Sequence, residues 1–431
     1  MNSPVSEQVT IGVPIYRGER YLDETLRAIQ AQTHRNFTVL MSLDGPDPVC
    51  EAICSRYLAD ERFRLTIQPA RLGWVGNLNW LLGRVSGGFW YFHQQDDLTE
   101  PTYLGSLLTL ARANPAAALV YCDVQPISRI SVEVPFQAPS VQGTPFIRQI
   151  TMLNEHLAAF AFRGLTKAEA VRAAGPVPTN AACNFGVDIT WLAAVARSGE
   201  LLRLPVALYS KRYHDRNTES GWWEWPEGTK LDAWTVHCTD MLKAALAIEV
   251  TVEQARLLFL AATARLVSVK VSGPFLHRSD FTNAERTWLL RRFLDLLENS
   301  SGHYLEAMLG MRWANIRRLA RSYAWMPSSK LDIVAFGPQP VALGAAFNTQ
   351  PDGHSAIWLR TSQPSALGWS IEFGGVRLET CITGTLLTAR VPQTMLQRAG
   401  GIPFRVIDSD GNPRSKTLRF VLTGDARPEA T

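Results

Sequence analysis

The sequence predicts an α/β domain with a mostly parallel open sheet, followed by an α-helical region and a small all-β sandwich. Between Val9 and Val124, short apolar runs alternate with longer segments of helical period, as in successive βαβ units. Helical periodicity continues from Leu231 to Trp325 with no strand pattern. After Pro327, short β-type runs are separated by Gly, Pro, Asn and Asp, which is typical of an antiparallel sandwich. The predicted domains are residues 1–225, 226–328 and 329–431.

The individual elements follow from these periods. Residues 21–32 are expected to form a helix because Leu22, Leu26 and Ile29 share one face. The segment 128–149 is rich in Pro, Gln and Ser and has no firm period, so we expect a loop region over the site. The expected strands of the first domain are residues 9–13, 37–43, 64–68, 89–93 and 118–123, and its further helices are 49–58, 75–85 and 103–112. The β-type runs of the tail are residues 331–336, 356–361, 369–373, 386–391, 403–407 and 418–422.

Composition limits the class of protein. The chain has 431 residues, of which 46% are hydrophobic and 19% charged, the balance of an ordinary folded protein. Its 43 basic and 39 acidic residues leave a formal charge of +4, so bulk charge does not predict a nucleic-acid partner. None of the six cysteines forms a Cys-x-x-Cys pair, and we expect reduced thiols in a cytoplasmic protein. We expect neither secretion nor a transmembrane segment, because no signal pattern and no run of roughly 18 apolar residues occurs.

Four polar residues, Gln94, Gln95, Asp96 and Asp97, close the apolar run at 89–93. Because an open α/β sheet binds ligands at the carboxyl ends of its strands, adjacent carboxylates there suit a metal ion and a diphosphate. The alternative is that both aspartates begin a loop and cap the helix that follows, since Asp, Thr and Pro are favoured at such positions. The tetrad alone does not decide between these interpretations.

Short motifs before and after this tetrad occur in a fixed order: Pro14-Ile15-Tyr16, Leu43-Asp44-Gly45-Pro46-Asp47, Arg71-Leu72-Gly73, Asn79 and Gly87. Over residues 8–218 the chain resembles the inverting family-two glycosyltransferases, whose nucleotide-sugar domain has the GT-A fold. The tetrad falls on the family's Asp-x-Asp-Asp motif. Two positions depart from the family pattern: Arg17 stands where asparagine is usual, and Gln94 replaces the first aspartate.

The resemblance implies a role for each motif residue. Asp44 would bind the nucleobase imide, and Gln94 would keep a ribose contact through its amide. Asp96 falls where the family's metal ligand lies, whereas Asp97 takes a supporting or capping role. A divalent ion, Mn²⁺ or Mg²⁺, would neutralise the charge that develops on the departing diphosphate. The implied nucleotide-sugar contacts are Pro14, Ile15, Tyr16, Asp44, Arg71, Asn79, Gln94, Gln95 and Asp96.

The family's catalytic base maps onto Asp188, in the run from Ala182 to Leu192. Inversion by direct displacement needs one carboxylate to accept the proton of the acceptor hydroxyl. Outside this context, an aspartate at a helix start is more often stabilised there by the macrodipole. Arg212-Tyr213-His214 resembles the family's Arg-x-His ending, so His214 is a candidate metal ligand or diphosphate donor, with a simple polar role as the alternative.

Three further segments allow two interpretations each. Trp222 and Trp223 could stack against an acceptor, or could form an aromatic lid over a domain junction. The basic helix at 312–321 could rest on an anionic membrane, although a solvated helix face is the more common explanation. The β-rich tail resembles immunoglobulin-like modules of the IPT type, a likeness that says nothing about chemistry.

From the resemblance we expect a metal-dependent inverting glycosyltransferase of the hexosyl-transferring type. It would move a sugar from a UDP or dTDP sugar onto a glycan or lipid-linked acceptor in bacterial surface-polysaccharide assembly, in the cytoplasm or peripherally at the inner face of the membrane. A catalytically degenerate glycan-binding or scaffold protein is the alternative that Arg17 and Gln94 support. A nucleotidyltransferase would need a glycine-rich and basic phosphate loop after the first strand, which residues 16–20 do not supply.

Overall fold

A computed structural model describes most of the chain. It divides the protein into two compact units, residues 1–266 with 287–320 and residues 267–286 with 321–431. The described residues are 7–127, 135–154, 159–267, 281–324, 333–343, 345–350, 354–361, 369–383, 385–408, 411 and 413–424.

The first unit is built on an eight-stranded sheet with the strand order β3-β2-β1-β4-β7-β6-β8-β5. Strands β3, β2, β1 and β4 are parallel, and so are β6 and β8. The short strand β7 runs antiparallel between β4 and β6, and β5 runs antiparallel to β8. The strands are β1 (Val9–Ile15), β2 (Phe37–Leu43), β3 (Phe63–Ile67), β4 (Phe89–Phe92), β5 (Leu98–Thr99), β6 (Ala117–Ile127), β7 (Leu165–Lys167) and β8 (Glu200–Arg212). This open, mixed sheet of the GT-A type confirms the predicted fold class.

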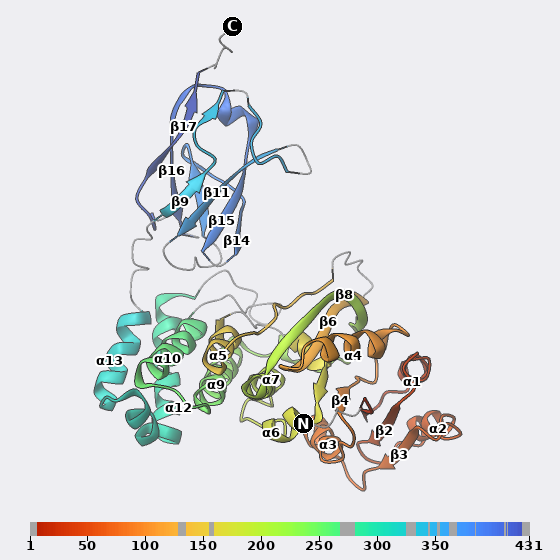
Figure 1. Cartoon of the computed structure of the whole chain (residues 1–431). Coiled ribbons are helices and arrows are strands. Elements are labelled where there is room, and N and C mark those ends of the chain that lie inside the picture. The colour runs from red at the N-terminus through yellow and green to blue at the C-terminus, as the bar shows by residue number, and fades with distance from the viewer. Residues whose placement is uncertain are drawn as a thin grey trace. The chain divides into compact units, whose positions relative to one another are not determined.

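Helices pack against this sheet and continue beyond it (Figure 1). Helix α1 buries Leu22, Leu26 and Ile29, the apolar face that the sequence predicts. Helix α2 begins where it does because the Asp47 side chain accepts hydrogen bonds from two amides of the first turn, with Pro48 at the first position. The helices are α1 (Leu22–Gln30), α2 (Pro48–Ser55), α3 (Gly73–Leu82), α4 (Tyr103–Ala113), α5 (Pro145–Asn154), η1 (Ala159–Arg163), α6 (Ala168–Ala174), α7 (Val187–Ser198), α8 (Thr218–Trp223), α9 (Glu227–Leu246), α10 (Val252–Val267), α12 (Asn283–Leu309) and α13 (Trp313–Ala324).

The prediction of a loop over residues 128–149 is wrong for residues 145–149, which belong to α5. Residues 128–134 lie outside the described residues, but α5 already begins at Pro145. The buried guanidinium of Arg148 donates to the carbonyls of Gly143, Ala196 and Arg197, the last two at the end of α7. Because a polar side chain anchors this helix to its neighbour, apolar periodicity does not reveal it.

The second unit contains two sheets, as predicted for a sandwich. Their strand orders are β10-β17-β16-β12-β13 and β14-β15-β11-β9, and all pairs are antiparallel except β10 with β17. Alternate side chains such as Ile357 and Leu359, or Ile371 and Phe373, fill the core between them. The start of the run predicted at 331–336 lies outside the described residues. The elements are β9 (Ile333–Gly337), β10 (Val341–Ala342), β11 (Ser355–Thr361), β12 (Ser370–Phe373), β13 (Val376–Arg377), β14 (Thr380–Thr383), β15 (Leu386–Val391), η3 (Gln393–Leu396), β16 (Gly400–Ile407) and β17 (Leu418–Thr423).

The IPT-type likeness of this unit and the domain limits at 225 and 328 stay predictions. Across the described part of the chain, every helix is too short or too polar to span a bilayer.

Close packing of β1 against β4 makes a first prediction possible. A Cβ atom at Gly12 would overlap the buried indole of Trp90. We expect Gly12→Ala to lower the free energy of unfolding by about 1–3 kcal/mol, the usual cost of overpacking. The measurement is urea unfolding of the full chain.

Gly105 in α4 provides the matched control, because its Cβ would meet nothing closer than Thr33 Oγ1 at 4.0 Å. Gly105→Ala should raise the unfolding free energy by up to about 1 kcal/mol, since alanine is the better helix former. Equal effects of the two substitutions would contradict this account of the strand packing.

Candidate active site

The tetrad lies where β4 ends, and its last member is a buried anchor. Asp97 has no exposed surface. Its carboxylate accepts hydrogen bonds from the Tyr209 hydroxyl and the Arg212 amide of β8, both at 2.8 Å. Arg163 of η1 contributes an ion pair at 3.4 Å. Burial raises the pKa of Asp97 to about 6, although the Arg163 guanidinium opposes this shift. Asp97 therefore ties β8 and η1 to the end of β4, the supporting role predicted for it.

Asp96 faces a different environment from its neighbour. Its Oδ2 lies 2.8 Å from Nε2 of His214 and 3.2 Å from Nδ2 of Asn217. The other oxygen, Oδ1, makes no hydrogen bond with any described residue. The two residues predicted as metal ligands, 118 positions apart, are thus brought into direct contact.

Hydrogen bonding determines which ring nitrogen of His214 carries the proton. The backbone amide of Arg216 donates to Nδ1 at 3.1 Å, so Nδ1 acts as an acceptor. In the neutral ring the proton then sits on Nε2 and is donated to Asp96. A histidine that ligates a metal through Nε2 normally donates from its other nitrogen instead. In this conformation His214 is therefore a proton donor to Asp96, and ligation would require the Arg216 contact to break.

Arg212 fixes the backbone around the tetrad. Besides the amide contact to Asp97, its Nε donates to the Asp96 carbonyl at 2.9 Å, and Nη2 pairs with Glu24 of α1 at 2.8 Å. The guanidinium also lies 4.3 Å from the ring centroid of Tyr21. The end of β8 therefore holds both the main chain and the side chain of Asp96.

The predicted nucleotide-binding residues Tyr16, Asp44 and Arg71 gather at the carboxyl ends of β1 and β2. Pro14 and the core residue Ile15 precede Tyr16, and the Ile15 carbonyl accepts the Asp44 amide at 2.8 Å. The Arg71 guanidinium lies 4.2 Å from the Tyr16 ring centroid and 3.9 Å from an Asp44 oxygen. These three side chains form one aromatic and charged cluster beside the tetrad.

Asp44 is also bonded to the start of α3. Its two oxygens accept the amides of Leu72 and Gly73 at 2.5 and 3.0 Å. A carboxylate has further lone pairs, so these bonds orient Asp44 without using its whole accepting capacity.

Three other predicted contacts, Gln95, Asn79 and Gln94, differ in how many hydrogen bonds their side-chain amides already make. Gln95 exchanges two hydrogen bonds with the main chain of Tyr16, at 2.8 and 2.9 Å. Asn79 does the same with Val177, at 2.9 and 2.8 Å. Both amides therefore hold backbone in this structure, and Asn79 supports the segment before α7. The side-chain amide of Gln94 makes no hydrogen bond with the described residues.

The predicted base, Asp188, lies in the first turn of α7. Gly186 precedes the helix in the left-handed region at φ 68°, and a side chain there would overlap His237. Asp188 is half-buried, and its Oδ1 accepts the amide of Ile189 at 2.9 Å. Burial raises the pKa of Asp188, while Arg163 and Lys211 act in the opposite direction. The same arginine thus influences Asp97 and Asp188.

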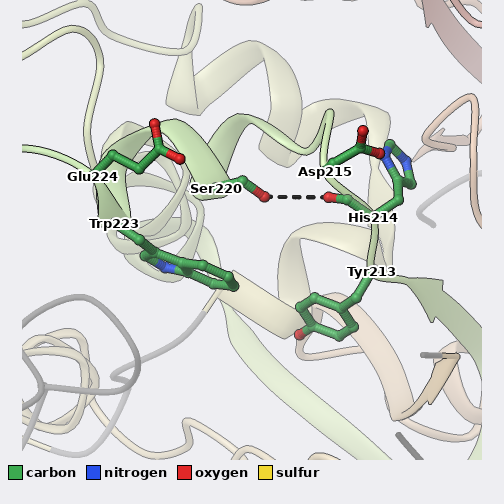
Figure 2. Close-up of a pocket in the computed structure, with 6 residues that line it drawn as sticks. All are labelled: Tyr213, His214, Asp215, Ser220, Trp223 and Glu224. Carbon is green, nitrogen blue, oxygen red and sulfur yellow. Dashed lines mark hydrogen bonds between the residues drawn. The ribbon is translucent and has the colours of Figure 1, made fainter. Parts of the chain in front are cut away.

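The structure separates the two tryptophans predicted to contact an acceptor. Trp222 packs edge-on against Phe185, with ring centroids 5.1 Å apart. Trp223 instead lines a cavity of about 340 Å³ (Figure 2). The lining residues are Tyr213, His214, Asp215, Ser220, Trp223 and Glu224.

Within the described residues, one set of three potential ligands also lies close together: Glu19, Asp47 and Cys50. Each has another task, since Glu19 pairs with Arg216 at 2.8 Å and Asp47 caps α2. Burial raises the pKa of the Cys50 thiol to about 12, so the thiolate that binds metals is disfavoured. This group does not fit a metal site.

Arg163, Tyr209 and Asn217 were not predicted as members of the site. Each acts on a tetrad residue through the tertiary structure. No local motif marks Arg163 or Tyr209. Asn217 follows the predicted residue His214 by three positions, and this closeness in sequence was the one feature that could have indicated its role.

Comparison with known proteins agrees with this architecture. Residues 10–168 match the model of Glycosyl transferase family 2. The matched segment is similar to family 2 glycosyltransferases and makes up less than half of the chain. The chain is 29% identical over 103 residues to Glycosyltransferase GlyA of Streptococcus pneumoniae serotype 4, a match spanning 24% of this chain and 15% of GlyA. It is 27% identical over 107 residues to an uncharacterized glycosyltransferase of Haemophilus influenzae, spanning 25% of this chain and 33% of that protein.

Among solved structures, the chain is similar in fold to S. aureus TarS. Against the longer TarS structure the TM-score is 0.54, with 11% identity and coverage of 98% of this chain and 79% of that one. Against TarS 1–349 in complex with UDP-GlcNAc the TM-score is 0.52, with 15% identity and coverage of 76% and 94%. The chain thus shares its fold with TarS at low sequence identity.

The buried network around Asp97 leads to the second prediction. Asp97→Ala removes the acceptor of two hydrogen bonds and the partner of the buried Arg163. We expect a loss of about 3–5 kcal/mol in the free energy of unfolding, as for other broken buried ion pairs. Asp97→Asn should cost clearly less, because its amide oxygen still accepts hydrogen bonds. Urea unfolding of both variants tests this, and similar small losses would show that the network is not a stability determinant.

Proposed function

We propose that the protein is an inverting glycosyltransferase that transfers a sugar from a nucleoside diphosphate to an acceptor hydroxyl. The observation that carries this proposal is the contact between Asp96 at the end of β4 and His214 after β8, 2.8 Å apart, beside the Tyr16, Asp44 and Arg71 cluster. Diphosphate, nucleobase and acceptor proton each have a matching group in this region.

A divalent ion is part of the proposal, and the donor set fits one. One oxygen of Asp96 makes no hydrogen bond with the described residues. Mg²⁺ in such enzymes is bound by one or two carboxylates together with substrate phosphates. When bound, the ion would neutralise charge on the departing diphosphate. His214 and Asn217 orient the Asp96 carboxylate through Oδ2. Because Nε2 of His214 carries a proton, this side chain is also able to donate a hydrogen bond to a phosphate oxygen of the diphosphate.

Asp188 is the group that we assign to the acceptor proton. The acceptor oxygen forms a bond to the anomeric carbon while the bond from that carbon to the diphosphate oxygen breaks. The electron pair of the broken bond leaves with the diphosphate, and the hydroxyl proton passes to the Asp188 carboxylate. A raised pKa brings this base closer to the pH at which the enzyme works, which favours proton transfer.

A UDP sugar is the donor that we favour. This choice rests on TarS, whose structure was determined in complex with UDP-GlcNAc. Tyr16 and Asp44 supply the aromatic face and carboxylate that suit a pyrimidine base with an imide N–H. The acceptor would be a glycan or lipid-linked sugar of surface-polysaccharide assembly, in the cytoplasm or at the inner face of the membrane.

The third prediction concerns Asp188 and pH. The ionised carboxylate is the active form, so turnover should fall as the pH falls through the raised pKa of Asp188. The acid limb of kcat/KM should therefore lie above roughly pH 3.9, the value for an unperturbed aspartate. Lys211→Met removes a cation that lowers this pKa, so the limb should move to higher pH.

Asp188→Asn is the companion variant. It should reduce transfer by at least about 10²-fold, the lower range for a general base, while UDP binding remains. Transfer at the wild-type rate in this variant, or a pH profile unmoved by Lys211→Met, would reject the assignment.

The fourth prediction addresses the ion. Calorimetry should show UDP binding that is strengthened by Mn²⁺ in the wild type, because Asp96 and the diphosphate share the ion. Asp96→Ala should remove the Mn²⁺ dependence. Asn217→Ala should weaken Mn²⁺-dependent binding by about 10-fold, since partners of a ligand typically contribute 10–100-fold.

Asn114→Ala is the control for this series, because its side chain only bonds the Leu110 carbonyl at the end of α4. It should bind UDP and Mn²⁺ as the wild type does. If the wild type binds no UDP with or without Mn²⁺, a glycan-binding scaffold replaces the transferase as the better account.

A further inference from the structure

We propose that the cavity beside His214 is an acceptor subsite for one uncharged sugar ring, with the ring stacked on Trp223. The inference rests on the proposed transferase function and specifies its acceptor class. The cavity of about 340 Å³ lies at the lower end of the range of ligand pockets, roughly 300–1,000 Å³, a size suited to a small ligand.

The cavity combines aromatic and polar walls. Trp223 lies at one side and Tyr213 and His214 at the other, with Ser220 between the two sides (Figure 2). Aromatic faces carry negative charge density, which attracts the weakly positive C–H groups on the flat face of a pyranose. Carboxylates and a hydroxyl around these rings can accept hydrogen bonds from sugar hydroxyls. This mixture of surfaces is suited to a sugar and poorly suited to an acyl chain.

The two adjacent tryptophans have different environments, which identifies Trp223 as the binding residue. Trp222 belongs to an aromatic cluster, 5.1 Å from Phe185 and 6.3 Å from Trp225 between ring centroids. Its ring supports the structure of α8. Trp223 lines the cavity, and its indole makes no aromatic contact or hydrogen bond with the described residues. The face of this indole is therefore available for a ligand.

The charge of the lining selects against anions. Asp215 and Glu224 both line the cavity, and none of the lining residues is a lysine or arginine. Arg216 pairs with Glu19 and Arg20 pairs with Asp215, while Lys211 Nζ lies 4.3 Å from the Tyr213 ring centroid. Glu224 is then the lining carboxylate that no described cation pairs with. A phosphate or carboxylate on the acceptor ring would be repelled by Glu224, whereas hydroxyl groups would be bonded by it. We therefore assign the subsite to a neutral sugar.

The location of the cavity connects it to the proposed chemistry. His214 lines the cavity and contacts Asp96, the proposed metal ligand. On the other side, Phe185 precedes Asp188 by three residues and packs against Trp222 of the same short helix that carries Trp223. Helix α8 thus links the cavity to the residues just before α7, the helix that carries the proposed base.

Saturation-transfer NMR tests the subsite with methyl glycosides of glucose, galactose, N-acetylglucosamine and rhamnose, each with the full chain, UDP and Mn²⁺. We expect at least one of these to bind the wild type. Trp223→Ala should weaken that binding by about 10-fold, from the loss of stacking and buried area, and Trp223→Phe should restore part of it. Circular dichroism of each variant verifies folding.

A matched anionic probe and a control variant complete the design. Methyl glucoside 6-phosphate should bind less well than methyl glucoside, and Glu224→Gln should reduce this difference. Trp288→Ala, which removes an exposed indole from α12, should leave glycoside binding unchanged. The subsite is rejected if UDP binds but no glycoside does, if Trp223→Ala binds as the wild type, or if the phosphorylated probe binds best. Absence of UDP binding would instead reject the transferase itself.

Discussion

The buried carboxylate of Asp97 is the interaction on which the rest of the site depends. Burial disfavours its charge, as the raised pKa of about 6 indicates, yet the side chain joins three separate parts of the chain. It holds Tyr209 and the Arg212 amide near the end of β8, and Arg163 at the end of η1. Together with the Arg212 guanidinium on the Asp96 carbonyl and the pairing of β5 with β8, this anchor holds the end of β8 beside β4, where His214 meets Asp96.

Adjacent aspartates in the tetrad consequently have different roles. Asp97 is fully buried, and its carboxylate accepts hydrogen bonds from Tyr209 and Arg212. Asp96 directs one oxygen to His214, and its other oxygen makes no hydrogen bond with the described residues. The guanidinium of Arg212 donates to the Asp96 carbonyl and the Arg212 amide donates to the Asp97 carboxylate, so one residue of β8 holds both aspartates. A single extended segment thus presents one structural and one proposed functional carboxylate.

Apolar periodicity predicted β1, β2, β3, β4 and β6, because buried strands leave runs of hydrophobic residues in the sequence. The expected strands did not include β5, β7 or β8. The same periodicity also placed Asp96 and Asp97 at a strand end. It did not reveal α5, which Arg148 anchors through carbonyls of α7, nor the parts played by Arg163 and Asn217. These contacts join residues far apart in the chain through polar atoms, and a one-dimensional hydrophobic pattern carries no record of such pairs.

Gln94, the departure from the family pattern, is explained by the same electrostatics. The charge of Asp96 already raises the pKa of Asp97, because like charges close together disfavour ionisation. A third carboxylate at position 94 would add to this repulsion within four residues. A glutamine keeps a hydrogen-bonding group at that position without adding charge. The substitution is consistent with a working donor site and does not by itself indicate a degenerate one.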